Sequence, residues 1–96
     1  MKKNLAETPL RFFSLPYDIY WVVQSSGILL EDEIGNRSLF VPYPKAAVLD
    51  LLARGCSSAY AVNILRHIAS LTPAQAEDKV ERWIKQWVNK RWLKST

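Results

Sequence analysis

The clearest pattern of apolar positions lies between residues 72 and 93. Five large apolar side chains recur there at spacings of three and four residues, which places them on one stripe of an α-helix: Val80, Trp83, Ile84, Trp87 and Val88. Thr72 is a favourable N-cap, Pro73 occupies the first helical position, and Gln75 completes a capping box. The pattern predicts a long, well-capped helix near the C-terminus.

Three segments rich in aromatic and β-branched residues precede the helical part of the chain, at residues 17–24, 28–31 and 37–41. Residues 25–27 (Ser-Ser-Gly) separate the first two segments. A polar stretch ending in Gly35 and Asn36, which suits a turn with positive φ, separates the last two. The pattern predicts a three-stranded antiparallel meander with one buried face.

Pro42 and Pro44 end the third strand, and two shorter helices are expected before the long one. The first covers residues 45–54 and stops at Gly55, and the second runs from Ser57 or Ser58 to about residue 70. The positions expected to face inward are Ala47, Val48, Leu51 and Leu52 in the first helix, and Ala61, Val62, Leu65 and Ile68 in the second. The predicted order is β-β-β-α-α-α, an α+β fold.

The chain is expected to form one domain over residues 17–94 after a lead-in over residues 1–16, since 96 residues support a single small core. Within the lead-in, the adjacent Phe12 and Phe13 are expected to pack against the domain, because exposed together they would be a liability. Trp92 and Leu93 are expected to fold back as a short extended piece.

The net charge of +4 is concentrated near the C-terminus, where residues 79–94 hold six basic side chains and one acid. A solvated helix face is the commoner explanation, and the functional alternative is a partner with negative charge, either nucleic acid or an acidic peptide. No apolar run approaches the length of a membrane span. Lys2 and Lys3 begin like a signal peptide, but no apolar segment follows, so a cytoplasmic protein is expected.

The residues that usually carry chemistry are few. Cys56 and His67 are the only cysteine and histidine, so an internal disulfide and a clustered metal site are not expected. The acidic run at residues 31–33 is more typical of a solvated turn than of a metal site. The sequence therefore predicts no catalytic residue, no metal ligand and no cofactor.

A meander exposes an edge strand, and here the third strand leads directly through prolines into the helical layer. A groove between this strand and the apolar long helix is therefore expected, with Lys79, Arg82 and Gln86 beside the apolar stripe. Core packing is the commoner role of Trp83 and Trp87. The alternative is that part of the stripe anchors a partner.

Residues 29–55 (LLEDEIGNRSLFVPYPKAAVLDLLARG), a second helix and an amphipathic third helix ending in Arg-Trp-Leu resemble the PqqD-like family over residues 17–93. These proteins are recognition elements for the precursors of ribosomally made, modified peptides. The chain departs from the family at residues 42–44, Pro-Tyr-Pro, where the family more often has a polar step such as Asn-x-Thr. The resemblance implies a winged-helix-like, stand-alone, non-catalytic protein.

The resemblance also implies where a peptide binds. In the family, a leader peptide adds as an antiparallel strand to the third strand and lies in a groove formed with the third helix. Transferred to this chain, the peptide-binding residues are Arg37, Ser38, Leu39, Phe40 and Val41 of the strand, with Lys79, Val80, Arg82, Trp83, Ile84 and Trp87 of the helix. Lys79, Arg82 and Lys85 would suit an acidic leader. The partners implied are a precursor peptide and a modifying enzyme such as a protease, cyclase or radical enzyme.

Two other functions compete with peptide capture. A winged-helix DNA-binding protein agrees with the basic excess. However, a DNA-recognition helix should present polar side chains to base edges. The usual wing also follows the recognition helix, whereas the hairpin here precedes all three helices. Nucleic acid is therefore not the expected partner. The third hypothesis is that the protein is a subunit that docks on another protein through the same apolar surface. None of the three hypotheses involves a membrane.

Overall fold

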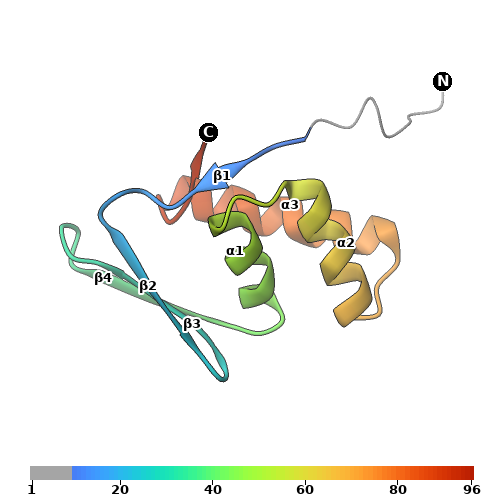
Figure 1. Ribbon diagram of the computed structural model, residues 1–96, viewed down its shortest axis with the longest axis horizontal. Helices are drawn as coiled ribbons and strands as arrows, with labels where there is room; N and C mark the ends of the chain where they lie inside the picture. Colours follow the sequence, from blue (N-terminus) through green and yellow to red (C-terminus); the bar gives the residue numbers. More distant parts are fainter. Residues whose placement is uncertain (1–9) are drawn as a thin grey trace.

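A computed structural model describes residues 10–96 and shows a three-stranded antiparallel sheet followed by three helices (Figure 1). The strands are β2 (Ile19–Gln24), β3 (Gly27–Asp32) and β4 (Arg37–Pro42), in the sheet order β2-β3-β4, and the helices are α1 (Lys45–Ala53), α2 (Ser58–Ile68) and α3 (Pro73–Asn89). The predicted α+β class and the order β-β-β-α-α-α are confirmed. Among residues 10–96, no helix is both long and apolar enough to cross a membrane.

Two short strands join the ends of the described chain. β1 (Phe13–Ser14) pairs antiparallel with β5 (Lys94–Ser95), with Phe13 opposite Ser95. Phe13 is buried, as expected, whereas Phe12 remains exposed. Phe13, within the predicted lead-in, therefore belongs to the core. The first nine residues of that lead-in lie outside the described part.

The core lies between one face of the sheet and the helices. Ile28 and Leu30 of β3 and Val41 of β4 are buried on this face, together with the apolar side of α1. Trp92 and Leu93, which follow α3, are also buried in the core. The expectation that they fold back onto the domain is confirmed, and they bring β5 to β1.

The buried side of α1 is shifted from the predicted one. The buried residues are Ala46, Val48, Leu49 and Leu52, whereas Ala47 and Leu51, predicted to face inward, are only half-buried. The reason is that α1 packs on β3 and β4 and also against α2. The helix therefore buries a sector that is centred on the boundary between two neighbours, and a narrow stripe in the sequence does not locate that sector.

Local signals set the end of α1 and the start of α2 as predicted. Gly55 has a φ of +96° directly after α1, which is the left-handed conformation that glycine adopts at this position. Ser57 accepts a hydrogen bond from the Tyr60 amide at 3.1 Å and caps α2. In α2, Ala61 and Leu65 are buried as predicted. Ile68 was expected inside but is exposed, because the helix ends at this residue.

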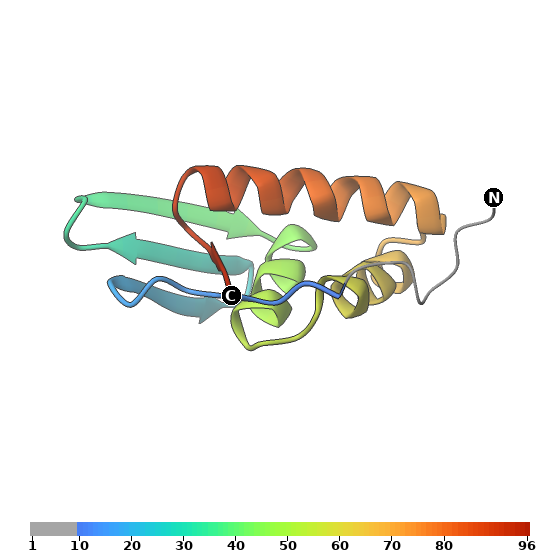
Figure 2. The ribbon, with the colours of Figure 1, turned by 90° about the horizontal axis from the view of Figure 1, so that it is seen from above.

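Helix α3 carries both halves of the predicted capping box. The Gln75 amide donates to the Thr72 hydroxyl at 3.2 Å, and the Thr72 amide donates to the Gln75 side chain at 3.0 Å. Viewed from above, α3 extends along the side of the sheet formed by β4, and β2 is the strand farthest from it (Figure 2). The fold thus places an edge strand next to the longest helix.

Candidate peptide-binding edge

Strand β4 ends the sheet on the side of α3, so one row of its backbone groups has no neighbouring strand within the described part. The Tyr43 amide donates to the Ser26 carbonyl just beyond the ladder. Antiparallel ladders alternate between hydrogen-bonded and non-hydrogen-bonded pairs. Counting back from Tyr43 through the register, the amides of Ser38 and Phe40 therefore point away from β3. These two amides can pair with an added strand.

The side chains of β4 divide between two faces. Leu39 and Val41 point into the helical side of the sheet, where Val41 is buried. Ser38 and Phe40 lie on the opposite, exposed face. The Phe40 ring lies across Gly27 of β3, so close that a Cβ atom at Gly27 would come 2.7 Å from the Phe40 Cζ atom. Phe40 therefore lies along the outer face of the sheet and not in a groove with α3.

Three of the four α3 residues predicted to line the groove serve the core instead. Val80, Ile84 and Trp87 are at most 3% exposed, so they are not available to a peptide on the surface. The side chain of Val41, predicted as part of the strand site, is likewise buried, and its backbone already pairs with β3. The burial of the three helix side chains was not evident from the sequence, because one apolar stripe does not distinguish its buried centre from its margin.

Trp83 lies at that margin and is half-buried. Its ring centroid is 6.4 Å from that of Trp87, with the planes tilted by 40°. The ammonium group of Lys45, which follows β4 in the chain, lies 5.5 Å from the Trp83 centroid and 5.7 Å from the Trp87 centroid. This distance is within the range of a cation–π contact. Trp83 is therefore the accessible aromatic of α3 on the β4 side.

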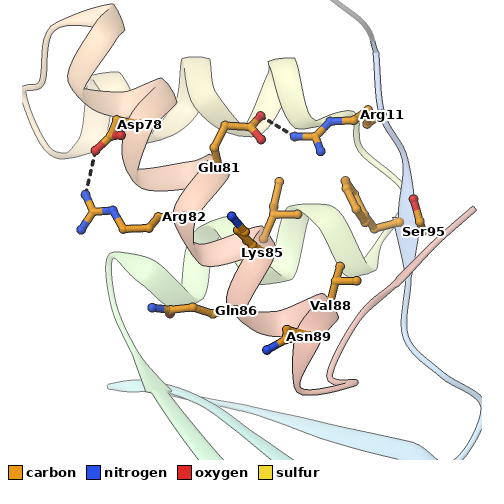
Figure 3. Close-up of a pocket in the computed structure, with 11 residues that line it drawn as sticks. Arg11, Asp78, Glu81, Arg82, Lys85, Gln86, Val88, Asn89 and Ser95 are labelled. Atoms are coloured by element: carbon orange, nitrogen blue, oxygen red, sulfur yellow. Dashed lines mark hydrogen bonds and ion pairs between the residues drawn. The ribbon is translucent and has the colours of Figure 1, made fainter.

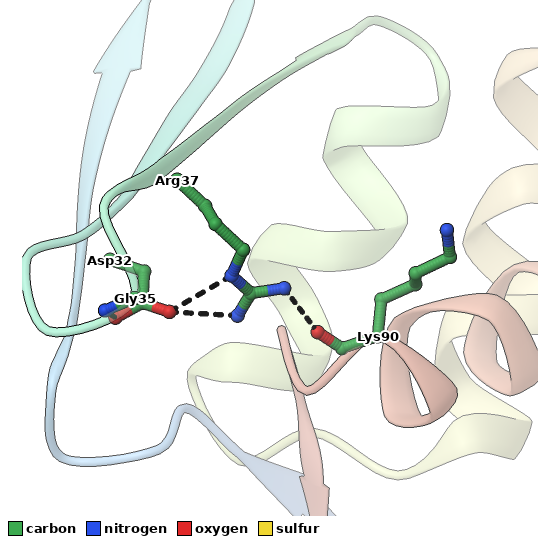
Figure 4. A network of polar contacts seen from close by, with 4 residues as sticks. All are labelled: Asp32, Gly35, Arg37 and Lys90. Carbon is green, nitrogen blue, oxygen red and sulfur yellow. Dashed lines mark hydrogen bonds and ion pairs between the residues drawn. The ribbon is translucent and has the colours of Figure 1, made fainter.

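The start of β4 is tied to the end of α3. The Nη1 atom of Arg37 donates to the Lys90 carbonyl at 2.7 Å (Figure 4). The same guanidinium donates from Nη2 and Nε to one carboxylate oxygen of Asp32, at 2.8 and 3.0 Å. With Lys45 over Trp83 near the end of β4, one cation at each end of the strand links it to the helix. Sequence analysis assigned Arg37 only a backbone role and missed Lys45.

The carboxylate of Asp32 is held by its own turn. It accepts a hydrogen bond from the Gly35 amide at 2.9 Å and is buried to 6% exposure. The backbone bond from Gly35 and the bond from Arg37 lower the pKa of Asp32 below its ordinary value, and its partial burial opposes them. Asp32 is therefore ionised at neutral pH and fixes the Arg37 guanidinium, which reaches Lys90.

A hollow of about 950 Å³ lies on the other flank of α3, between this helix and the β1–β5 pair (Figure 3). Phe13, Ile84 and Val88 contribute apolar surface, and charged side chains surround it. Two ion pairs are seen there, Arg11 with Glu81 and Arg82 with Asp78. Arg82 was predicted to face the peptide groove, but it lines this separate hollow, as does Lys85.

The structure therefore places the predicted site residues in different environments. Ser38 and Phe40 of β4 are exposed, Lys79 and Trp83 of α3 are half-buried, and Leu39 contributes to the core side of the sheet. The remaining members are buried, belong to the hollow, or, for Arg37, link strand to helix. Among residues 10–96, no group of three His, Cys, Asp or Glu side chains could hold a metal ion.

Comparisons with protein-family models, curated proteins and solved structures gave no match to this chain.

Proposed function

We propose that this protein is a non-catalytic peptide-binding module, which captures the leader of a ribosomally made precursor peptide and presents it to modifying enzymes. The observation that carries the proposal is the open edge of β4 beside the half-buried Trp83. Strand addition to such an edge is an established mode of peptide recognition, in which main-chain bonds provide affinity and side-chain contacts provide specificity.

The geometry of β4 defines the added strand. The amides of Ser38 and Phe40 donate to carbonyls of the peptide, and the carbonyls of the same two residues accept from its amides. Pro42 has no amide, so the donor row stops at Phe40. At the start of β4, the hydrogen bond from Arg37 to the Lys90 carbonyl limits how far the added strand can extend. The bound segment is therefore short, about four residues of paired backbone.

The side chains of the added strand alternate between two environments. Those on the helical side face α3, where Trp83 is half-buried and the Lys45 ammonium group lies 5.5 Å from the centroid of its ring. Those on the other side lie next to Ser38 and Phe40. An apolar or aromatic residue facing Trp83, flanked by acidic residues, is the sequence pattern that this surface favours. This chemistry agrees with the resemblance to the PqqD-like family.

The experiment that tests the proposal is a titration of Trp fluorescence with two peptide sources. One is a set of synthetic leaders encoded by short reading frames next to the gene, and the other is a set of peptides selected from a random display library on the purified protein. The central variant is Ser38→Pro, which removes an outward amide without breaking a bond to β3. Trp83→Ala removes the aromatic contact.

The expected result is saturable binding that falls at least tenfold in Ser38→Pro and in Trp83→Ala. Lys85→Ala, in the hollow on the other flank of α3, is the matched control and binds like the parent. Equal binding by Ser38→Pro and the parent contradicts the proposal, as does the absence of any binding peptide from both sources. Duplex DNA titrated at two salt concentrations tests the rival hypothesis of a DNA-binding protein, which predicts DNA binding that weakens steeply as the salt concentration rises.

A further inference from the structure

The opposite edge of the sheet, formed by β2, is more apolar than the β4 edge. Tyr17 just before the strand is 92% exposed, and Tyr20, Val22 and Val23 are each more than half exposed. Asp18 is the only charged residue in the segment 17–24. Edge strands in soluble proteins are usually protected by charges, prolines or a covering element. Within residues 10–96, the outer edge of β2 has none of these protections beyond Asp18.

The backbone of β2 also has open donors. Gln24 and Gly27 flank a two-residue hairpin loop, so they form a hydrogen-bonded pair. The alternation then directs the amides of Ile19, Trp21 and Val23 away from β3. The Ile19 amide is used locally, since it donates to the Pro16 carbonyl at 3.0 Å. The amides of Trp21 and Val23 remain open to another strand.

We propose that β2 is the interface of a homodimer, in which it pairs antiparallel with β2 of a second copy and Trp21 lies on the two-fold axis. A self-paired antiparallel strand is isologous, so one patch supplies both halves of the contact. The inference goes beyond the proposed function, because peptide capture at β4 does not require a dimer. The two sheets become one sheet of six strands.

Side-chain pairing selects this register. With Trp21 opposite its own copy, Tyr20 lies opposite Val22 of the second copy, twice by symmetry. Aromatic and β-branched residues are favourable cross-strand neighbours. If the two-fold axis instead passed through Val22, Tyr20 would lie opposite the polar Gln24. On the outer face, Val22 already lies in a row with Leu29 and Phe40, and Tyr20 of the second copy lengthens this apolar row by one residue.

The charges of the two copies agree with the pairing. The protein carries a net charge of +4, which opposes association at most surfaces. Strand β2 (Ile19–Gln24) contains no charged residue, however, so no like charges face each other along the paired strands. Arg54, which lies 5.5 Å from the Trp21 ring, is already paired with Asp50 at 2.9 Å. The interface therefore contains no unpaired like charges.

The exposed area sets the strength of the dimer. An aromatic side chain buries about 150–250 Å², so two exposed tyrosines and two half-exposed valines offer a few hundred Å² per copy. A stable interface needs about 800 Å² per partner. The dimer is therefore reversible, with a dissociation constant expected in the micromolar range. Both β4 edges remain free at the outer ends of the sheet and can each receive a peptide.

Sedimentation velocity over a wide range of protein concentration tests the inference. The weight-average mass of the parent should rise from 11.0 kDa toward twice that value. Val23→Pro, which removes an outward amide of β2, should remain at the monomer mass, whereas Ser38→Pro, its counterpart at the β4 edge, should associate like the parent. A parent that stays monomeric up to about 1 mM, far above the micromolar range, overturns the inference. Loss of association in Ser38→Pro but not in Val23→Pro also overturns it.

A charge pair tests the register and does not depend on how Val23→Pro folds. Tyr20→Lys and Val22→Glu should each weaken self-association by at least tenfold. Mixed together, they should form a heterodimer, because the register places the introduced cation of one chain opposite the introduced anion of the other. Recovery of association in the mixture supports the pairing, and a mixture in which both variants stay monomeric contradicts it. Circular dichroism of each variant confirms that it is folded.

Discussion

Arg37 and Lys90 are 53 residues apart in the chain, yet the Arg37 guanidinium donates to the Lys90 carbonyl at 2.7 Å (Figure 4). Lys90 is the C-cap of α3, where carbonyls lack partners within the helix and the dipole favours a cation. The same guanidinium binds Asp32 and lies 4.2 Å from the centroid of the Trp92 ring. One side chain thus connects the β3–β4 hairpin, the end of α3 and the C-terminal segment.

We expect Arg37→Lys to lower the free energy of unfolding by about 1 kcal/mol, since a lysine cannot reach Asp32 and Lys90 together. Urea denaturation followed by circular dichroism measures the change. Arg82→Lys is the matched control, because Arg82 forms an exposed pair with Asp78 at the i,i+4 spacing. Such pairs contribute about 0.3–0.5 kcal/mol. Equal effects of the two substitutions would argue against a linking role for Arg37.

Asp32 should make the stability depend on pH in the acid range. Its pKa is lowered in the folded state by the bonds from Gly35 and Arg37. The stabilisation is therefore complete above the unfolded-state pKa, about 3.9, and is lost as the pH falls through the lower folded-state pKa. Thermal melts of the parent and Asp32→Asn between about pH 6 and 2 should converge at the acid end. A constant difference in melting temperature would contradict this assignment.

The two neighbouring tryptophans of α3 should respond differently to truncation. Trp87 is 2% exposed, so Trp87→Ala should cost about 3–5 kcal/mol of stability by leaving a cavity. Trp83 is half-buried at the margin of the same stripe. Trp83→Ala should cost about 1 kcal/mol and act mainly on peptide affinity. Urea denaturation of both variants distinguishes them, and a larger loss for Trp83→Ala would show that its role is structural.

Two glycines offer a comparison between close contact and backbone strain. A Cβ atom at Gly27 would lie 2.3 Å from the Val41 carbonyl oxygen and would also displace the Phe40 ring. At Gly55, with φ of +96°, a Cβ atom would meet nothing within 4 Å. We expect Gly27→Ala to cost about 2–3 kcal/mol and Gly55→Ala about 1 kcal/mol. The reverse order in thermal denaturation would mean that the strands adjust to the added methyl group.

Local signals in the sequence predicted the features that local interactions determine. The capping box of Thr72 and Gln75 and the left-handed Gly55 were identified because each depends on residues only a few positions apart. The strand order likewise follows from short turns. The edge position of β4, and with it the open amides of Ser38 and Phe40, could therefore be expected.

Contacts between distant elements could not be predicted. The stripe of α3 gives no sign that Trp87 is buried and Trp83 partly open, because the difference depends on where β4 and α1 lie. Arg37 and Lys90 are far apart in the sequence, and nothing in the sequence around either residue indicates their hydrogen bond. The shifted phase of α1 has the same origin, since the sheet and α2 share its buried side.

The most direct test of peptide capture is amide hydrogen exchange, measured by NMR with and without the tightest-binding peptide of the leader and display sets. Strand addition to β4 predicts new protection of the Ser38 and Phe40 amides, with little change at Leu39 and Val41, which already pair with β3. Protection gained instead at Trp21 and Val23 would place the peptide on the opposite edge. Protection at neither edge would contradict strand addition altogether.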